Sequence, residues 1–239
     1  MKHQFQMAAA LFAAGMLLVG CGWLPSLVLG VLDTDLAGKE QLEQMEISWP
    51  EKLQKRISTG EKLVILENRR IALKEDMEPS VQLRKTVQEQ LQEYADHGLL
   101  TDEQLQLPFP WLPFVCYEAE KPERNVMIWE VVSGNGDTEN LKAIGMTVDG
   151  ETGQILRMSA SAPGMIEKSV VSTRVSEAGS LFLNQLGVLY RAAGSLSGED
   201  SATVSYQIHD EENPEMQLGT LTVSMNPDHF HTNFEMMQH

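Results

Sequence analysis

The sequence predicts an α+β fold with an N-terminal membrane segment, a helical region, and two tandem units that each combine a helix with an antiparallel strand meander. Three observations predict it. An uncharged apolar stretch opens the chain, the spacing of apolar residues changes from helical to alternating after a cluster of prolines, and helix followed by strands occurs twice. The expected segments are 1–32 for the membrane segment, 33–107 for the helical region, 108–163 for the first sheet with 79–97 as its covering helix, and 164–239 for the second unit.

The apolar stretch from Met7 to Leu32 is long enough to cross a bilayer, because a helix rises about 1.5 Å per residue and the hydrocarbon core is roughly 30 Å thick. Two interpretations of it stay open. Residues 18–21 (LVGC) resemble the lipobox of bacterial lipoproteins, in which the chain is cut before the cysteine and Cys21 carries a lipid. Alternatively, the segment stays uncleaved as one membrane helix, since residues 22–32 are also apolar. Both interpretations place the chain from Asp33 onward outside the membrane.

Helical signals dominate residues 33–107. Ser48, Pro50 and Glu51 form a capping box with proline in the first turn, which predicts a helix that ends near Gly60. Residues 61–77 suit either a helix or a strand. The clearest helix is expected over 79–97, because its apolar residues recur on one face and a histidine-glycine pair closes it. These apolar residues are Leu83, Val87, Leu91 and Tyr94.

Past the prolines of 108–113, apolar and polar residues alternate, which is typical of half-buried antiparallel strands. Strands are expected over 126–132, 144–148 and 154–159, and residues 149–153 (DGETG) supply a tight turn. In the second unit, Ser176 is expected to cap a helix that ends near Gly194. Three more alternating strands follow it, with apolar residues Val204, Tyr206, Ile208, Leu221, Val223, Met225, Phe230, Phe234 and Met236.

The hairpin over Val126–Ser159 resembles the PepSY-type hairpin. The similarity lies in a strand with a central tryptophan (MIWEVV) and above all in residues 148–156 (VDGETGQIL), with their aspartate, threonine-glycine turn and outgoing apolar strand. The resemblance implies an α+β domain outside a bacterial membrane, with roles in peptidase inhibition or the regulation of cell-surface events. The chemistry of the motif itself is that of a turn, because Asp149 can accept backbone N–H groups and Gly150 and Gly153 can adopt positive φ.

Charge and cysteine usage exclude several classes of protein. The formal net charge is −16, which excludes nucleic acid as a partner and an electrostatic attachment to anionic lipid. Only Cys21 and Cys116 occur, which excludes a disulfide framework and a four-thiolate zinc site. Cys116 lies in a strand-like run and is expected to be a buried, inert thiol.

One group of residues is a candidate metal site. His229, His231 and Glu235 fall on one face of a predicted strand, and His209 is expected on the same polar face of a neighbouring strand. Two or three imidazoles with a carboxylate can bind zinc, although a solvated sheet face explains the same pattern. No serine-nucleophile motif and no phosphate-binding loop occur, so no catalytic residues and no cofactor are expected.

The sequence therefore favours a membrane-tethered, extracytoplasmic, non-enzymatic domain. The N-terminus is expected to hold it to the cell membrane, while the acidic body contacts an unidentified protein partner in a regulatory, inhibitory or accessory role. A metal-binding module or metal-dependent enzyme using His209, His229, His231 and Glu235 is the alternative. A third hypothesis, a binder of a small ligand or lipid between two sheets, requires a large enclosed apolar pocket.

Overall fold

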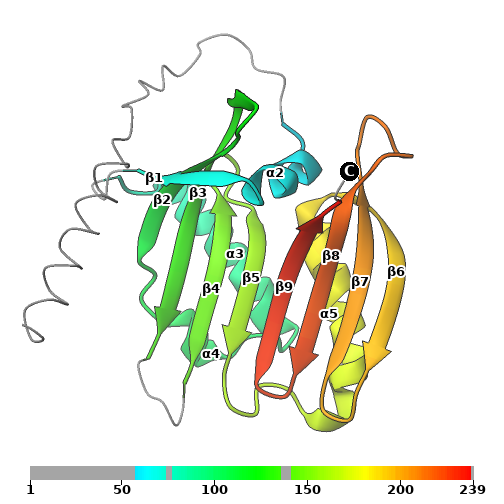
Figure 1. Cartoon of the computed structure of the whole chain (residues 1–239). Coiled ribbons are helices and arrows are strands. Elements are labelled where there is room, and N and C mark those ends of the chain that lie inside the picture. Colours follow the sequence, from blue (N-terminus) through cyan, green and yellow to red (C-terminus); the bar gives the residue numbers. More distant parts are fainter. Residues whose placement is uncertain (1–56, 74–76, 136–140, 238–239) are drawn as a thin grey trace, which may run out of the picture. The chain divides into compact units, whose positions relative to one another are not determined.

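A computed structural model describes residues 57–73, 77–135 and 141–237 of the chain, and its central feature is one nine-stranded sheet. The strands lie in the order β1-β2-β3-β4-β5-β9-β8-β7-β6, and each neighbouring pair is antiparallel (Figure 1). Their bounds are β1 Arg69–Ala72, β2 Trp111–Glu118, β3 Lys121–Gly134, β4 Ala143–Asp149, β5 Ile155–Ser161, β6 Leu189–Ser197, β7 Ala202–His209, β8 Gln217–Asn226 and β9 His229–Met236.

The predicted fold class is wrong, because the two meanders are not separate units. Strands β2–β5 and β6–β9 join through β5 and β9, with Ala160 opposite Phe230 at the centre of the pairing. Each meander alone would end in an unpaired strand edge, and the β5–β9 pairing covers three residues of each edge, Ser159–Ser161 of β5 and His229–His231 of β9. Alternation along a strand identifies its faces but not its partner, so the sequence pattern could not show this junction.

The α-helices of the described residues are α2 Thr59–Leu66, α3 Val81–Asp96, α4 Asp102–Leu105 and α5 Val171–Leu186. Figure 1 shows α3, α4 and α5 behind the sheet and α2 in front of its upper end. The core lies between α3, α5 and the sheet. Tyr94 of α3 packs against Phe230 of β9 with 6.3 Å between ring centroids, so the core continues across the junction of the two meanders. None of the helices in the described ranges is both long and apolar enough to cross a membrane.

Helix α3 confirms the helix expected over 79–97. Ser80 is its N-cap and accepts a hydrogen bond from the backbone N–H of Leu83. His97 ends it, and Gly98 follows with φ of +68°, a conformation that favours glycine. The four apolar residues expected on one face are the four buried residues of the helix. Periodicity and local capping together were enough to predict this element.

The N-terminal half of the predicted helical region needs correction. Residues 1–56 lie outside the described ranges, and with them the membrane segment, Cys21 and the capping box at Ser48. No helix ends near Gly60, because Gly60 lies in the first turn of α2. The ambiguous stretch 61–77 contains both alternatives, the rest of α2 and then strand β1, which pairs with β2. The region 33–107 is therefore not wholly helical.

Helix α5 begins and ends earlier than expected. It starts at Val171 with no side-chain cap, so Ser176 lies inside the helix rather than at its start. Gly187 ends the helix with φ of +63°, and the chain then enters β6 at Leu189. Gly194 is consequently a residue of an edge strand. The uncapped start left no local signal in the sequence.

The expected burial of Cys116 is confirmed, since its side chain is almost wholly inaccessible. Burial, with a smaller contribution from the negative charge of Glu130 and against the opposing charge of Arg70, raises the pKa of its thiol to about 11. The neutral thiol is the stable form at physiological pH.

Candidate functional site

The DGETG turn between β4 and β5 is the centre of the candidate site. Gly153 has φ of +75°, as the turn chemistry predicts, and an added Cβ there would lie 3.2 Å from Thr86 of α3. Gly150 does not have positive φ. It is needed for a close approach, because an added Cβ would lie 2.9 Å from the backbone oxygen of Met127. The turn therefore packs tightly against β3 on one side and α3 on the other.

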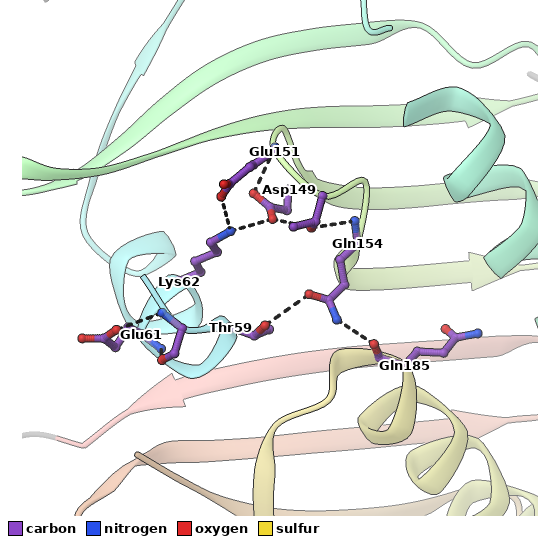
Figure 2. Close-up of polar contacts among 9 residues, drawn as sticks. Thr59, Glu61, Lys62, Asp149, Glu151, Gln154 and Gln185 are labelled. Carbon is purple, nitrogen blue, oxygen red and sulfur yellow. Dashed lines mark hydrogen bonds and ion pairs between the residues drawn. The ribbon is translucent and has the colours of Figure 1, made fainter. Parts of the chain in front are cut away.

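A buried ion pair joins this turn to helix α2. The ammonium of Lys62 lies 2.7 Å from Asp149 Oδ2 and 3.1 Å from Glu151 Oε2 (Figure 2). The side chains of Lys62 and Asp149 are 7% and 1% exposed, whereas that of Glu151 is 68% exposed. Asp149 also accepts hydrogen bonds from the Thr152 hydroxyl and the Glu151 backbone N–H. The buried charges of Lys62 and Asp149 therefore each have a partner of opposite charge, which buried ions need to be stable.

Glutamines extend the contacts of the turn to two more helices. The amide of Gln90 on α3 donates to Gly153 O at 2.8 Å and accepts from the Ile155 N–H at 3.1 Å. Gln154 accepts from the hydroxyl of Thr59 on α2 and donates to the backbone oxygen of Gln185 at the end of α5. Figure 2 shows Gln154 between these two elements. The turn therefore holds α2, α3 and α5 in fixed positions around itself.

Helix α2 is fixed at its start by a capping box that the sequence analysis missed. The backbone N–H of Glu61 donates to Ser58 Oγ, and the Ser58 N–H donates to the Glu61 carboxylate at 2.9 Å. The second carboxylate oxygen of Glu61 accepts from Arg124 at 2.7 Å. The Ser-x-x-Glu spacing at 58–61 is a local signal that could have placed the start of this helix.

These elements line an open cleft of about 710 Å³. Its walls come from the start of α2, one side of α3, the β4–β5 turn, the end of α5 and the turn after β7. The lining carries six carboxylates, from Glu61, Glu89, Glu93, Asp210, Glu211 and Glu212. Lys62 is the one amine among the described residues of the lining, and it already contacts Asp149. The cleft is therefore strongly negative, and it favours a positively charged ligand.

The end of α5 contributes a further polar group to the cleft. Gln185 donates from its side-chain nitrogen to Glu93 Oε2 at 2.6 Å, which ties α5 to α3. Its side-chain oxygen is buried and has no hydrogen-bond partner among the described residues. Among the described residues, the cleft lining contains hydroxyls, carboxylates and amides but neither histidine nor cysteine, so the groups that it offers to a ligand are polar and mostly acidic.

The four candidate metal ligands do not converge. His209 is the last residue of β7 and His229 the first of β9, and these strands run in the same direction, so the two lie at opposite ends of the sheet. Seven residues of extended chain correspond to roughly 20 Å. His229 and His231 are neighbours with 6.0 Å between ring centroids, but Glu235 lies four residues farther along β9 and is exposed. Within the described ranges, no three metal-ligating side chains form a group.

His209 is also not on the polar face. The strand register shifts between Ile208 and His209, and this irregularity turns the imidazole into the interior, where it is 5% exposed. Neither ring nitrogen has a hydrogen-bond partner in the described part of the chain. Strict alternation predicted the opposite face, and a bulge is the kind of irregularity that alternation cannot show.

His231 gives the domain a sensitivity to acid. Burial lowers its pKa from 6.5, and the positive charges of His229 and Arg157 lower it further. The unfolded chain therefore binds this proton at a higher pH than the folded chain, so the free energy of unfolding falls as the pH drops below 6.5. Urea unfolding at pH 7.5 and at pH 5 measures this loss. We expect the free energy of unfolding to fall less between the two pH values in His231→Gln than in the exposed-site control His97→Gln. Equal losses in the two variants would contradict the assignment.

Comparisons with known proteins give no information about the site. No protein-family model matches the chain, and neither a curated protein nor a solved structure matches it.

Proposed function

We propose that this chain is a membrane-tethered, extracytoplasmic domain that acts without catalysis, through contacts with a protein partner in the bacterial envelope. The observation that carries the proposal is the acidic cleft, in which α2, α3 and the turn after β7 place six carboxylates around an open volume. A rigid polar cleft of one charge is suited to binding a complementary segment of another protein.

The partner chemistry follows from the charge of the cleft. A segment rich in lysine or arginine can place its amines or guanidinium groups against the exposed carboxylates of Glu211 and Glu89, and Glu89 has only a solvent-exposed contact with Lys85 at 3.6 Å. The net charge of −16 steers such a segment toward the domain over a distance of about one Debye length. The same charge disfavours nucleic acid.

The resemblance to PepSY-type hairpins supports this proposal, because the similar residues build the wall of the cleft. Asp149 holds α2, Gly153 allows α3 to approach, and Gln154 connects α2 with α5. In this proposal the motif shapes a binding site rather than taking part in a reaction.

The tether is the apolar segment 1–32, with Cys21 lipidated or the segment retained as a membrane helix. Helix α2 is the first described element after this segment. The ion pairs of Lys62 with Asp149 of β4 and of Glu61 with Arg124 of β3 hold it to the sheet.

Site-specific photocrosslinking in living cells tests the proposal. A photoreactive residue at Glu89, inside the cleft, should give a discrete protein adduct, and one at Gln82, on the same helix outside the cleft lining, should not. Glu89→Lys combined with Glu211→Lys should abolish an adduct formed from Glu93. The control pair Glu120→Lys and Glu215→Lys changes the net charge equally at exposed residues outside the cleft and should leave it intact. Equal adducts at positions 82 and 89, or loss of the adduct in both charge pairs, would refute cleft binding.

A further inference from the structure

His229 and His231 place two imidazoles on the same face of strand β9. Successive side chains of a strand point to opposite faces, so residues two apart point to the same one. Phe230, between them, packs against Tyr94 of α3. The two imidazoles therefore lie on the other face of the sheet, in front of which Figure 1 shows α2 near the upper end. Both histidines are half-exposed, so solvent reaches them.

The spacing of the two rings suits the chelation of one metal ion. Their centroids are 6.0 Å apart, and their planes are 21° from parallel. Each ring nitrogen lies about 2.1 Å from a bound zinc ion, so two rings on one tetrahedral ion have centroids about 5 Å apart. A shift of about 0.5 Å by each ring closes this difference, and a small change in the side-chain torsions of half-exposed residues is enough for it.

A serine orients one of the two imidazoles. His229 Nδ1 lies 2.7 Å from the hydroxyl oxygen of Ser161, the residue opposite it on β5. A hydroxyl can accept a hydrogen bond from an Nδ1–H group, and that tautomer leaves the lone pair of Nε2 free. Histidines that bind metals usually make such a second hydrogen bond, which fixes both the tautomer and the orientation of the ring.

We propose that His229 and His231 together chelate one divalent transition-metal ion of the class of Zn²⁺, with Ser161 as a positioning residue for His229. Imidazole nitrogens suit zinc, copper and nickel. Once one ring holds the ion, the second is at high effective concentration, so the pair binds more tightly than either ring alone. The other two positions of a tetrahedral ion are left for water or for a ligand from outside the chain.

The surroundings of the pair are compatible with a bound cation. Arg157 of β5 carries a positive charge that acts on His231, but it forms an ion pair with Glu67 at the end of α2. The net charge of the whole chain is −16, which attracts cations to the domain. The described lining of the acidic cleft contains neither histidine of the pair, so this inference is independent of the proposed function.

Calorimetric titration of the full-length chain in detergent with zinc chloride tests the inference. His3, His97 and His239 are first replaced by glutamine, which leaves the pair and the buried His209 as the only histidines. We expect one zinc ion to bind per chain. His229→Gln and His231→Gln should each weaken this binding at least tenfold, because a single imidazole cannot chelate.

The role of Ser161 has its own matched set of variants. Ser161→Ala should weaken zinc binding about tenfold, as the loss of a hydrogen bond to a metal-binding histidine does. Ser161→Thr keeps the hydroxyl and should restore the binding. Ser159→Ala changes the serine opposite His231, whose hydroxyl bonds to the Gly145 oxygen instead, and should alter the binding less than twofold. Equal losses in Ser161→Ala and Ser159→Ala would contradict the positioning role.

Two outcomes would overturn the metal site itself. One is the absence of binding up to about 1 mM zinc, and the other is binding that persists unchanged in both His229→Gln and His231→Gln. Far-UV circular dichroism of each variant, with a cooperative thermal transition, separates a lost site from a lost fold. Photocrosslinking at Glu89 should be unaffected in both histidine variants, so failure of this inference and failure of cleft binding give different results.

Discussion

Lys62→Met is expected to lower the free energy of unfolding by about 3 kcal/mol, because it leaves the carboxylate of Asp149 buried without its counter-ion. The carboxylate is 1% exposed, so water cannot replace the lost ammonium. Its remaining hydrogen bonds from Thr152 and the Glu151 N–H compensate only part of the charge. Urea unfolding followed by tryptophan fluorescence measures the change, since Trp129 is buried in the same half of the sheet.

Two comparisons isolate the buried charge from other effects of that substitution. Lys62→Met combined with Asp149→Asn has no buried charge and should recover at least about 1 kcal/mol relative to Lys62→Met alone. Lys85→Met removes an equally long cation whose partner, Glu89, lies on the exposed surface, and it should cost less than about 0.5 kcal/mol. If Lys62→Met costs no more than Lys85→Met, the ion pair does not hold α2 to the sheet.

Thr232→Val is expected to destabilise the junction between the two meanders by about 2 to 4 kcal/mol. The Thr232 hydroxyl accepts from the Met158 N–H at 2.9 Å and donates to the Met158 oxygen at 3.2 Å, so it continues the β5–β9 contact beyond the paired residues. Valine has nearly the same shape but leaves both backbone groups unsatisfied. Each buried unsatisfied group costs about 1 to 3 kcal/mol.

Thr232→Ser is the matched control for the junction. Serine keeps the hydroxyl and loses one methyl group, so we expect a cost of about 1 kcal/mol in the same urea experiment. The threonine side chain is 1% exposed, which makes both substitutions sensitive to its surroundings. A valine variant as stable as the serine variant would show that the hydroxyl contributes nothing to joining the meanders.

Local patterns predicted the elements that local forces determine. Helix α3 follows from the spacing of its apolar residues and from Ser80 at its cap, and the turn at Gly153 follows from the need for positive φ. The alternating strands were identified for the same reason, because each side of a strand repeats every second residue. Even here a local signal was missed, since the Ser-x-x-Glu spacing of Ser58 and Glu61 could have placed the start of α2.

Contacts between residues far apart in the sequence could not be predicted from local patterns. Lys62 and Asp149 are 87 residues apart, and nothing in the composition of either segment selects the other. The pairing of β5 with β9 depends on which strand edges remain open once each meander has formed. His209 became buried through a register shift that leaves no mark in the order of apolar and polar residues. The walls of the cleft come from segments that are far apart in the sequence, so its existence could not be inferred before those segments were placed.

The proposed function presumes that the domain lies outside the membrane, and labelling of intact cells tests this placement most directly. Glu120 lies in an exposed turn between β2 and β3, and Glu120→Cys provides a thiol for a membrane-impermeant maleimide. We predict that intact cells expressing this variant are labelled at residue 120, and that cells expressing the unchanged chain, whose Cys116 is buried and whose Cys21 lies in the proposed membrane segment, are not. Labelling that requires permeabilised membranes would place the domain in the cytoplasm and contradict the account.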